Sequence, residues 1–522
     1  MLPPRRRLRP HALFPALVVV SLCACDEPAP SPPDASVDVP AAIDRVDTPD
    51  REVTPDSPST PDDLGTPDRL IVADTPAPLD VLDVPAADRP APADVMVATD
   101  ASPARPRSVL IVIADDFGVD SAGFYADRDG DGTPDDGRTY APMPTVADLC
   151  RRGVTFRQAW SAATCSPTRA QLLTGRFPFR TGVVQPVAGP DGAIRPNERT
   201  LPRVLDLNPA LDFAHANIGK WHLGNSTALG GTMAPNRMGW SHYSGNLSAQ
   251  IASFTAWDRV TDGLTERVTE YATTVTVSDA TAWLDRQRPG RPWLLWVAFN
   301  APHSPHHLPP ASLVTTTLPG TPTDIMRRPA MYFRASLEAL DREIGRLLRH
   351  PRVASDQPLV VFFGDNGTSG EVVEAPYDRT RAKWTPYQNG LHVPMCVAGP
   401  GIAGARPSDA LINVVDLYPT VLDAMGAERT TWEASGQPID GVSYWPFLRD
   451  ATVAAPRTTN FAEAIAGSGA TPSSLGRAAR DERYKLLRFN DGREELYDLT
   501  NDPRELTNLR GMVDGDAALR AR

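Results

Sequence analysis

The chain has 522 residues, five cysteines and a formal net charge of −12. The acidic excess lies mainly in residues 26–107, which hold 18 acidic side chains against six arginines, so residues 108–522 have a net charge of only −4. Because residues 108–522 carry nearly equal numbers of acidic and basic side chains and show no basic stripe, we expect no nucleic-acid partner.

Residues 1–25 have the composition of an export signal. Four arginines precede an apolar run from Ala12 to Leu22, which is shorter than the roughly 20 residues that span a bilayer. The run ends in Leu22-Cys23-Ala24-Cys25, which resembles a bacterial lipobox with Cys25 as the lipid-bearing residue. Cys23 departs from that pattern, so cleavage without lipidation stays open. We expect an exported protein, periplasmic or at the cell surface, anchored to a bacterial membrane through Cys25.

Residues 26–107 form a candidate tether. They contain no aromatic residue and one glycine, and Thr-Pro-Asp recurs every six residues from Thr48. Such a segment cannot bury enough apolar surface to fold. We therefore predict a disordered, Pro/Asp/Ala-rich spacer that needs no partner of its own.

From residue 108 onward, short apolar strands alternate with helical stretches, which predicts an α/β fold. Three continuous apolar runs fit strands buried on both faces: Val109 to Ala114, Trp293 to Phe299 and Leu359 to Phe363. Polar clusters follow each run, beginning at Asp115, Asn300 and Gly364. Because ligands of open α/β sheets gather beyond the carboxyl ends of strands, we expect these clusters to meet at one edge.

An acidic segment follows the first run. Asp127, Asp129 and Asp131 have the Asp-x-Asp-x-Asp-Gly spacing of EF-hand and thrombospondin type 3 calcium loops. Arg138 occupies the twelfth position, where an EF-hand has Glu, so the ligand set is incomplete. A second calcium site and a solvated acidic loop are both compatible with this pattern.

Two cysteines outside the signal lie in apolar surroundings. Cys150 ends a helical pattern, and Cys396 lies within a predicted strand. An exported protein could pair them, but two buried thiols fit the same pattern.

Residues 165–176 read Cys-Ser-Pro-Thr-Arg-Ala-Gln-Leu-Leu-Thr-Gly-Arg. Pro167 suits the first helical position and Gly175 the helix end, which places Cys165 at the positive end of a helix dipole. Arg169 returns to the same side within one turn. The pattern favours an anion site, although a helix start with a structural thiol is the simpler interpretation of a lone Cys-x-Pro.

The twelve-residue string resembles the activation signature of the type I sulfatases, formylglycine-dependent enzymes of the alkaline phosphatase superfamily. In that family a formylglycine-generating enzyme oxidises the cysteine, and the hydrated aldehyde becomes the nucleophile. The resemblance implies a catalytic domain over 108–460, with a large, mostly parallel mixed sheet between helices. It also implies a small C-terminal α+β subdomain on an antiparallel sheet over 461–522.

The resemblance implies a divalent cation, usually Ca²⁺. Its ligands would be Asp115, Asp116, Asp365, Asn366 and the modified Cys165. Taken alone, Asp115-Asp116 could be a polar strand end, and Asp365-Asn366-Gly367 an ordinary turn. Both pairs together supply the hard oxygen ligands that calcium prefers.

The remaining catalytic positions also follow from the resemblance. Lys220 and His222, in Gly-Lys-Trp-His-Leu-Gly, match the lysine that holds the sulfate and the histidine that acts as base. His303 matches the histidine that faces the leaving oxygen, and Lys383 matches the lysine that helps protonate it. Arg169, together with Lys220, Lys383 and the cation, would hold the sulfuryl charge as it shifts. One departure is Gln388-Asn389, where the family commonly has Glu-Gly.

The implied activity is hydrolysis of a sulfate monoester, on a sulfated small molecule or polysaccharide, by a sulfuric ester hydrolase. Two alternatives stay open: a formylglycine-dependent phosphodiesterase or phosphonate monoester hydrolase, and a lipoprotein that binds sulfated glycans without cleaving them. Trp240, His242, Tyr243 and Trp384 could stack on a sugar or aryl ring, or could be packing residues.

Overall fold

The structure is a computed structural model that describes residues 106–127, 133–189, 192–225, 230–433, 436–465 and 475–515, all within one compact unit. The predicted export signal with Cys25, the tether up to residue 105, and Asp129 and Asp131 lie outside these residues. Among the described helices, none combines the length and apolar character that crossing a membrane requires.

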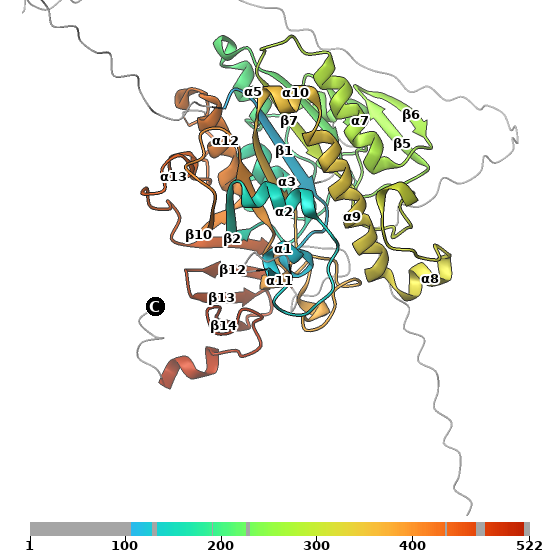
Figure 1. Cartoon of the computed structure of the whole chain (residues 1–522). Coiled ribbons are helices and arrows are strands. Elements are labelled where there is room, and N and C mark those ends of the chain that lie inside the picture. The colour runs from blue at the N-terminus through green and yellow to red at the C-terminus, as the bar shows by residue number, and fades with distance from the viewer. Residues whose placement is uncertain are drawn as a thin grey trace, which may run out of the picture. The chain divides into compact units, whose positions relative to one another are not determined.

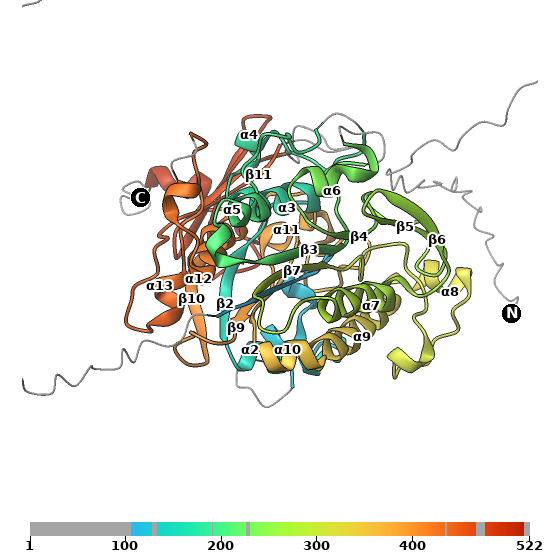
Figure 2. The same cartoon turned by 90° about the horizontal axis from the view of Figure 1, so that it is seen from above.

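A ten-stranded mixed sheet forms the centre of the described chain (Figures 1 and 2). Its strands, in spatial order, are β10 (Arg406–Asn413), β2 (Val154–Trp160), β9 (Met395–Ala398), β8 (Leu359–Gly364), β1 (Val109–Ala114), β7 (Trp293–Ala298), β3 (Ala214–Gly219), β4 (Tyr243–Gly245), β5 (Trp257–Thr261) and β6 (Leu264–Val268). Neighbouring strands run parallel except at β9 and at the β4–β5–β6 edge. The predicted mixed, mostly parallel sheet is confirmed.

Helices cover both faces of this sheet (Figure 2). Alternate side chains of β1 point to opposite faces, so Val109, Ile111 and Ile113 belong to one hydrophobic cluster and Leu110 and Val112 to the other. The first cluster includes residues of α3 (Cys165–Thr174), α5 (Leu201–Asp206), α12 (Leu417–Met425) and α13 (Trp445–Arg449). The second includes residues of α2 (Pro144–Arg151), α7 (Ala272–Asp285), α9 (Pro329–Leu348) and α10 (Pro351–Asp356). Burial on both faces explains why these strands are continuously apolar.

Shorter helices lie in the connections. They are α1 (Gly123–Ala126), α4 (Pro178–Thr181), α6 (Ala234–Arg237), α8 (Pro322–Arg327) and α11 (Gln388–Leu391). Helix α11 begins five residues after Lys383, a predicted catalytic residue, and it packs against the C-terminal sheet through Leu391.

The C-terminal segment forms a separate antiparallel sheet, coloured orange to red in Figure 1. Its four strands, paired in chain order, are β11 (Asn460–Ala464), β12 (Gly476–Arg480), β13 (Tyr484–Phe489) and β14 (Glu494–Asp498). One face packs on Trp160, the last residue of β2, and on Tyr387 and Leu391. The predicted antiparallel C-terminal sheet is confirmed, and it contacts the segments next to two predicted catalytic residues, Cys165 and Lys383.

Cys150, in α2, and Cys396, in β9, form a disulfide across 246 residues of sequence. Both side chains are buried. Of the two possibilities that the sequence left open, the structure contains the bonded one, which ties a surface helix to a central strand.

Candidate active site

Strand register brings the predicted site residues to one edge of the sheet. Ala114 of β1 pairs with Gly364 of β8, so Asp115 and Asp365 leave neighbouring parallel strands at the same level. In the same way, Gly219 of β3 pairs with Ala298 of β7. A Cβ built at Gly219, where φ is +97°, would lie 1.9 Å from the Ala298 carbonyl oxygen, so only glycine fits immediately before Lys220.

Helix α3 places Cys165 at its first position. The helix begins at Cys165 and ends before Gly175, whose φ of +69° is the left-handed conformation that glycine favours. Pro167 is therefore the third helical residue. The sequence predicts it at the first position, so that prediction is wrong by two residues. Cys165 is only 1% exposed, and burial raises the pKa of its thiol to about 11. As a thiol, this side chain would stay protonated at neutral pH and would be a poor nucleophile.

Two buried ion pairs flank Cys165. Lys220 Nζ lies 2.6 Å from Asp115 Oδ2, and Arg169 Nη2 lies 2.7 Å from Asp365 Oδ2. Arg169 also donates to the Lys220 carbonyl oxygen at 2.8 Å, which joins the two pairs. Burial, together with the nearby charge of Asp365, raises the pKa of Asp115 to about 8. The raised pKa shows that Lys220 and Arg169 do not fully offset burial and the charge of Asp365 at this carboxyl group.

Asp116 forms a third pair on the other side of the site. Its Oδ1 lies 2.6 Å from Lys383 Nζ and accepts a hydrogen bond from Asn366 Nδ2 at 2.8 Å. Burial alone would raise the pKa of Asp116, but Lys383 and His303 hold it well below its usual value. Burial alone would lower the pKa of Lys383, but Asp116 raises it, so Lys383 is a cation.

His222 is buried with both ring nitrogens lacking a hydrogen-bond partner. Burial, and then the cations Lys220 and Arg169, lower the pKa of His222 well below its usual value, so the ring is neutral. A neutral imidazole with an unoccupied nitrogen can accept a proton from a group placed beside it.

His303 belongs to the same cluster as Asp115 and Asp116, and its side chain is 13% exposed. Its Nδ1 lies 2.8 Å from the Ser304 carbonyl oxygen, which requires a proton on Nδ1 and leaves Nε2 unprotonated in the neutral ring. Nε2 lies 3.7 Å from Asp116 Oδ2. Burial lowers the pKa of His303 to about 3.

The donor set fits a hard divalent cation. Ligand atoms of Asp115, Cys165 and Asp365 lie within 4.8 Å of one another, as do those of Asp115, Asp116 and His303. Two buried oxygens, Asp115 Oδ1 and Asn366 Oδ1, have no hydrogen-bond partner. Unpaired buried oxygens beside several carboxylates suit a bound cation, which would also supply the positive charge that Asp115 lacks.

Three residues of the site have a positive φ without being glycine: Asp116 (62°), His222 (53°) and Trp384 (81°). This conformation costs energy for a residue with a Cβ, and it persists where the surroundings enforce it. Each residue is, or adjoins, a predicted catalytic or metal-binding residue.

The aromatic candidates separate into two groups. Trp240 and Tyr243 are packing residues, since both belong to the buried core, and His242 Nδ1 lies 2.7 Å from Asp262 Oδ2. Trp384 differs, because Lys383 Nζ lies 6.0 Å from the centre of its ring. It is the member of the four that remains beside the site.

Sequence reasoning missed two elements of the site. Ser166, the variable residue of Cys-x-Pro-x-Arg, donates to the His222 carbonyl oxygen at 2.6 Å. Glu371 lies 2.9 Å from His306 Nε2 and close enough to Asp116 and His303 to interact electrostatically with both. Ser166 lies inside the twelve-residue string, but at its variable position, and Glu371 lies outside every string that the resemblance covers. The sequence signal for both was proximity to the motifs.

Arg138, at the twelfth position of the acidic segment, is turned inward. Its guanidinium lies 4.9 Å from the centre of the Tyr140 ring and 5.1 Å from that of Tyr377, and it donates to the Asp120 carbonyl oxygen at 2.7 Å. This residue anchors the segment to the loop after β1. Because Asp129 and Asp131 lie outside the described residues, the second calcium site stays a prediction.

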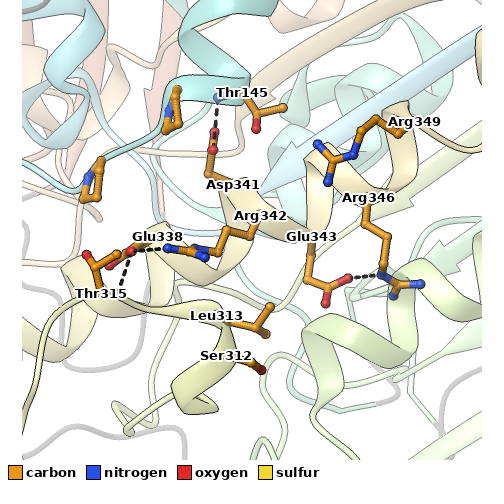
Figure 3. A pocket seen from close by; sticks show the side chains of 12 residues that line it. Thr145, Ser312, Leu313, Thr315, Glu338, Asp341, Arg342, Glu343, Arg346 and Arg349 are labelled. Carbon is orange, nitrogen blue, oxygen red and sulfur yellow. Dashed lines mark hydrogen bonds and ion pairs between the residues drawn. The ribbon is translucent and has the colours of Figure 1, made fainter.

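A cavity of about 480 Å³ beside α9 contains none of the predicted site residues (Figure 3). Its acidic groups already have partners: Asp341 accepts from the Thr145 backbone amide at 3.0 Å, and Glu343 pairs with Arg346 at 2.7 Å. Figure 3 shows both interactions. These contacts hold α9 in place, and this role accounts for the charged residues that line the cavity.

Comparisons with known families agree on one description. Residues 107–427 match the family profile described as Sulfatase, and residues 380–518 match that of the N-sulphoglucosamine sulphohydrolase C-terminal region.

Curated relatives carry related names. The chain is 27% identical over 335 residues to the uncharacterized sulfatase YdeN of Escherichia coli (59% of this chain, 57% of YdeN). It is 28% identical over 378 residues to arylsulfatase G of Mus musculus (61% and 65%), and 24% identical over 385 residues to the ulvan-active sulfatase of Formosa agariphila (70% and 72%). The match thus spans less than two thirds of the first two relatives.

Solved structures share the fold. The crystal structure of Ps i-CgsB has a TM-score of 0.65 at 22% identity, over 80% of this chain and 91% of that one. The structure of BT4656 with its substrate D-glucosamine-2-N,6-O-disulfate has a TM-score of 0.59 at 20% identity, over 80% and 96%.

Proposed function

Because the chain belongs to the sulfatase family, we propose that it hydrolyses sulfate monoesters to an alcohol and inorganic sulfate. The observation that carries this proposal is the convergence of three buried cations, Lys220, Arg169 and Lys383, around Cys165 at a helix start. Buried cations and helix amides stabilise a sulfuryl group whose charge shifts during transfer.

We propose that Cys165 is converted to formylglycine by a formylglycine-generating enzyme. The thiol is buried and its pKa is raised to about 11, so the unmodified side chain would be a weak nucleophile. Formylglycine supplies a hydrated aldehyde, whose hydroxyl groups provide both a nucleophile and a route back to the aldehyde. Arg169 would stabilise the site by holding Asp365 and the Lys220 carbonyl oxygen in place.

A divalent cation, Ca²⁺ by family resemblance, would be held by Asp115, Asp116, Asp365, Asn366 and residue 165. When bound, it would supply positive charge to the nucleophile and to the sulfuryl oxygens. The unpartnered Asp115 Oδ1 and Asn366 Oδ1 support this assignment.

The protein side chains divide the proton transfers. His222 is neutral with unoccupied nitrogens, so it would accept a proton from residue 165. Lys383 is cationic, so it would protonate the leaving oxygen, and His303, whose neutral ring lies beside Asp116, would face and orient that oxygen. Lys220 would hold the sulfuryl group, because its ammonium lies beside Asp115 at the nucleophile.

We also propose that the protein is exported and lipid-anchored through Cys25. The Cys150–Cys396 disulfide supports an oxidising compartment. For the substrate we propose a sulfated small molecule or polysaccharide, because relatives include the ulvan-active sulfatase, and BT4656 binds a sulfated glucosamine.

The first experiment measures the mass of the tryptic peptide Gln158–Arg169 in protein made in its native host. The same preparation is then assayed with an aryl sulfate and an aryl phosphodiester, with Cys165→Ala as the control. An aldehyde at residue 165 and faster turnover of the sulfate would support the proposal. Faster turnover of the phosphodiester would favour a phosphodiesterase, and an intact thiol without turnover a glycan-binding protein.

A further inference from the structure

The loop that carries Lys383 is bonded to the C-terminal segment on both sides of this residue. Before it, Arg381 donates to the Glu505 carbonyl oxygen, and its guanidinium lies 4.5 Å from the centre of the Tyr387 ring. After it, the Gln388 backbone amide donates to Glu505 Oε2 at 2.6 Å. The Tyr387 hydroxyl donates to Glu495 Oε2 at 2.8 Å. Glu505 therefore contacts this loop on either side of the lysine.

A buried ion pair holds Glu505 in this position. Lys485 Nζ lies 2.7 Å from Glu505 Oε1, and the two side chains are 0% and 2% exposed. Glu505 Oε1 thus faces the Lys485 ammonium as an ion pair, and Oε2 accepts a hydrogen bond from the Gln388 amide. The φ of Glu505 is +59°, a strained conformation for a residue with a Cβ.

The same ion pair adjoins the segment that leads to Cys165. Lys485 Nζ lies 5.0 Å from the centre of the Trp160 ring, and Trp160 Nε1 donates to Gln388 Oε1 at 3.2 Å. Further along, the Trp384 amide donates to the Ala163 carbonyl oxygen at 2.9 Å. Residues 160–165 and 383–388 are thus linked at two points, with Lys485 and Glu505 packed at one of them.

Burying two charges carries a large desolvation penalty, and apolar residues of similar volume often stabilise a fold as well or better. Trp160, Tyr387 and Leu487 already form an apolar core at this junction. Stability alone therefore does not explain why a charge pair lies here. The pair is explained if its role is to direct Glu505 toward the Gln388 amide.

We propose that Lys485 and Glu505 are positioning residues that hold Lys383 at the leaving oxygen of the substrate. This inference rests on the proposed function, in which Lys383 helps to protonate that oxygen. The C-terminal sheet thereby takes part in catalysis without touching the substrate. Without the ion pair, Glu505 is no longer held against the Gln388 amide, and the loop carrying Lys383 becomes free to shift.

The test compares two aryl sulfates, 4-nitrophenyl sulfate with a good leaving group and phenyl sulfate with a poor one. Proton donation matters more for the poorer leaving group, and a positioned general acid contributes about 10²- to 10⁴-fold. In Lys485→Met we expect kcat/KM to fall at least ~10-fold more for phenyl sulfate than for 4-nitrophenyl sulfate. Lys383→Met should show the same bias.

Arg483→Met is the matched control. Arg483 immediately precedes β13, the strand that carries Lys485, and it pairs with Asp498 at 2.7 Å rather than with Glu505, so both substrates should keep their wild-type rates. Glu505→Gln is the second variant, for the case that Lys485→Met does not fold. It keeps an acceptor for the Gln388 amide, and we expect the same bias with a smaller magnitude.

Three results are decisive. A folded Lys485→Met or Glu505→Gln that loses both substrates equally, or that matches Arg483→Met, would overturn the positioning role while the sulfatase activity of the wild type stands. A selective loss on phenyl sulfate supports the role. If the aldehyde-bearing wild type hydrolyses no sulfate ester at all, the proposed function fails, and the positioning role fails with it.

Discussion

Ser166 and His222 are joined directly, because the Ser166 hydroxyl donates to the His222 carbonyl oxygen at 2.6 Å. The same hydroxyl accepts from the Val187 amide at 3.0 Å. One side chain next to Cys165 therefore holds the backbone of the proposed base in its left-handed conformation.

Ser166→Ala should lower both stability and activity. It leaves two buried backbone groups without a partner, each worth about 1–3 kcal/mol. For the two groups together we expect the unfolding free energy measured by urea denaturation to fall by about 2–6 kcal/mol, and kcat to fall as well. Ser355→Ala, at an exposed serine, is the control. An unchanged unfolding free energy would show that the hydrogen bond contributes nothing.

Calcium should raise the melting temperature of the wild type. Binding to the folded state alone adds about 2.7 kcal/mol when free calcium is ~100 times Kd. Asp115→Asn should abolish most of this shift, because it removes a charged ligand of the proposed site. Asp258→Asn, at an exposed carboxylate paired with Arg267, should keep it. Equal shifts in both variants would place calcium elsewhere.

Stability should fall as the pH drops from 6.5 to 4. Burial lowers the pKa of His392 to about 4, whereas the unfolded side chain titrates near 6.5. Between these values the unfolded chain binds the extra proton, so the unfolding free energy rises with pH. The contribution is complete above pH 6.5 and lost near pH 4.

His392→Gln isolates this contribution. His392 Nε2 donates to the Arg157 carbonyl oxygen at 2.7 Å, and glutamine retains a donor without titrating. The variant should therefore lose less unfolding free energy than the wild type between pH 6.5 and 4.5. Superimposable pH curves would rule out this histidine as a cause.

Removing the disulfide should destabilise the fold. Cys150→Ala/Cys396→Ala frees a loop of 246 residues, and loss of a native disulfide costs typically about 2–5 kcal/mol. We expect a lower melting temperature, and a similar decrease when the wild type is treated with dithiothreitol. A double variant that melts like the oxidised wild type would contradict this expectation.

Local signals predicted much of the fold. The apolar run Val109 to Ala114 coincides with β1, and Leu359 to Phe363 differs from β8 by one residue. These strands could be recognised because burial on both faces demands an apolar side chain at every position. The edge strand β6 and its neighbour β5 carry exposed polar residues and had no such signal.

The sequence by itself determined which side chains are available to the site and where each strand or helix delivers them. Motifs such as Cys-x-Pro-x-Arg and Gly-Lys-Trp-His are local, because a helix start or a tight turn depends on neighbouring residues. The roles assigned to those residues stay predictions.

Only the tertiary structure decided which charges meet. Lys220 pairs with Asp115 across 105 residues and Lys383 with Asp116 across 267, while Cys150 bonds Cys396 across 246. Trp240 and Tyr243 are packing residues because both are buried in one hydrophobic cluster of the core. Strand order, register and the docking of the C-terminal sheet set these contacts, and they depend on the packing of distant segments that no local pattern contains.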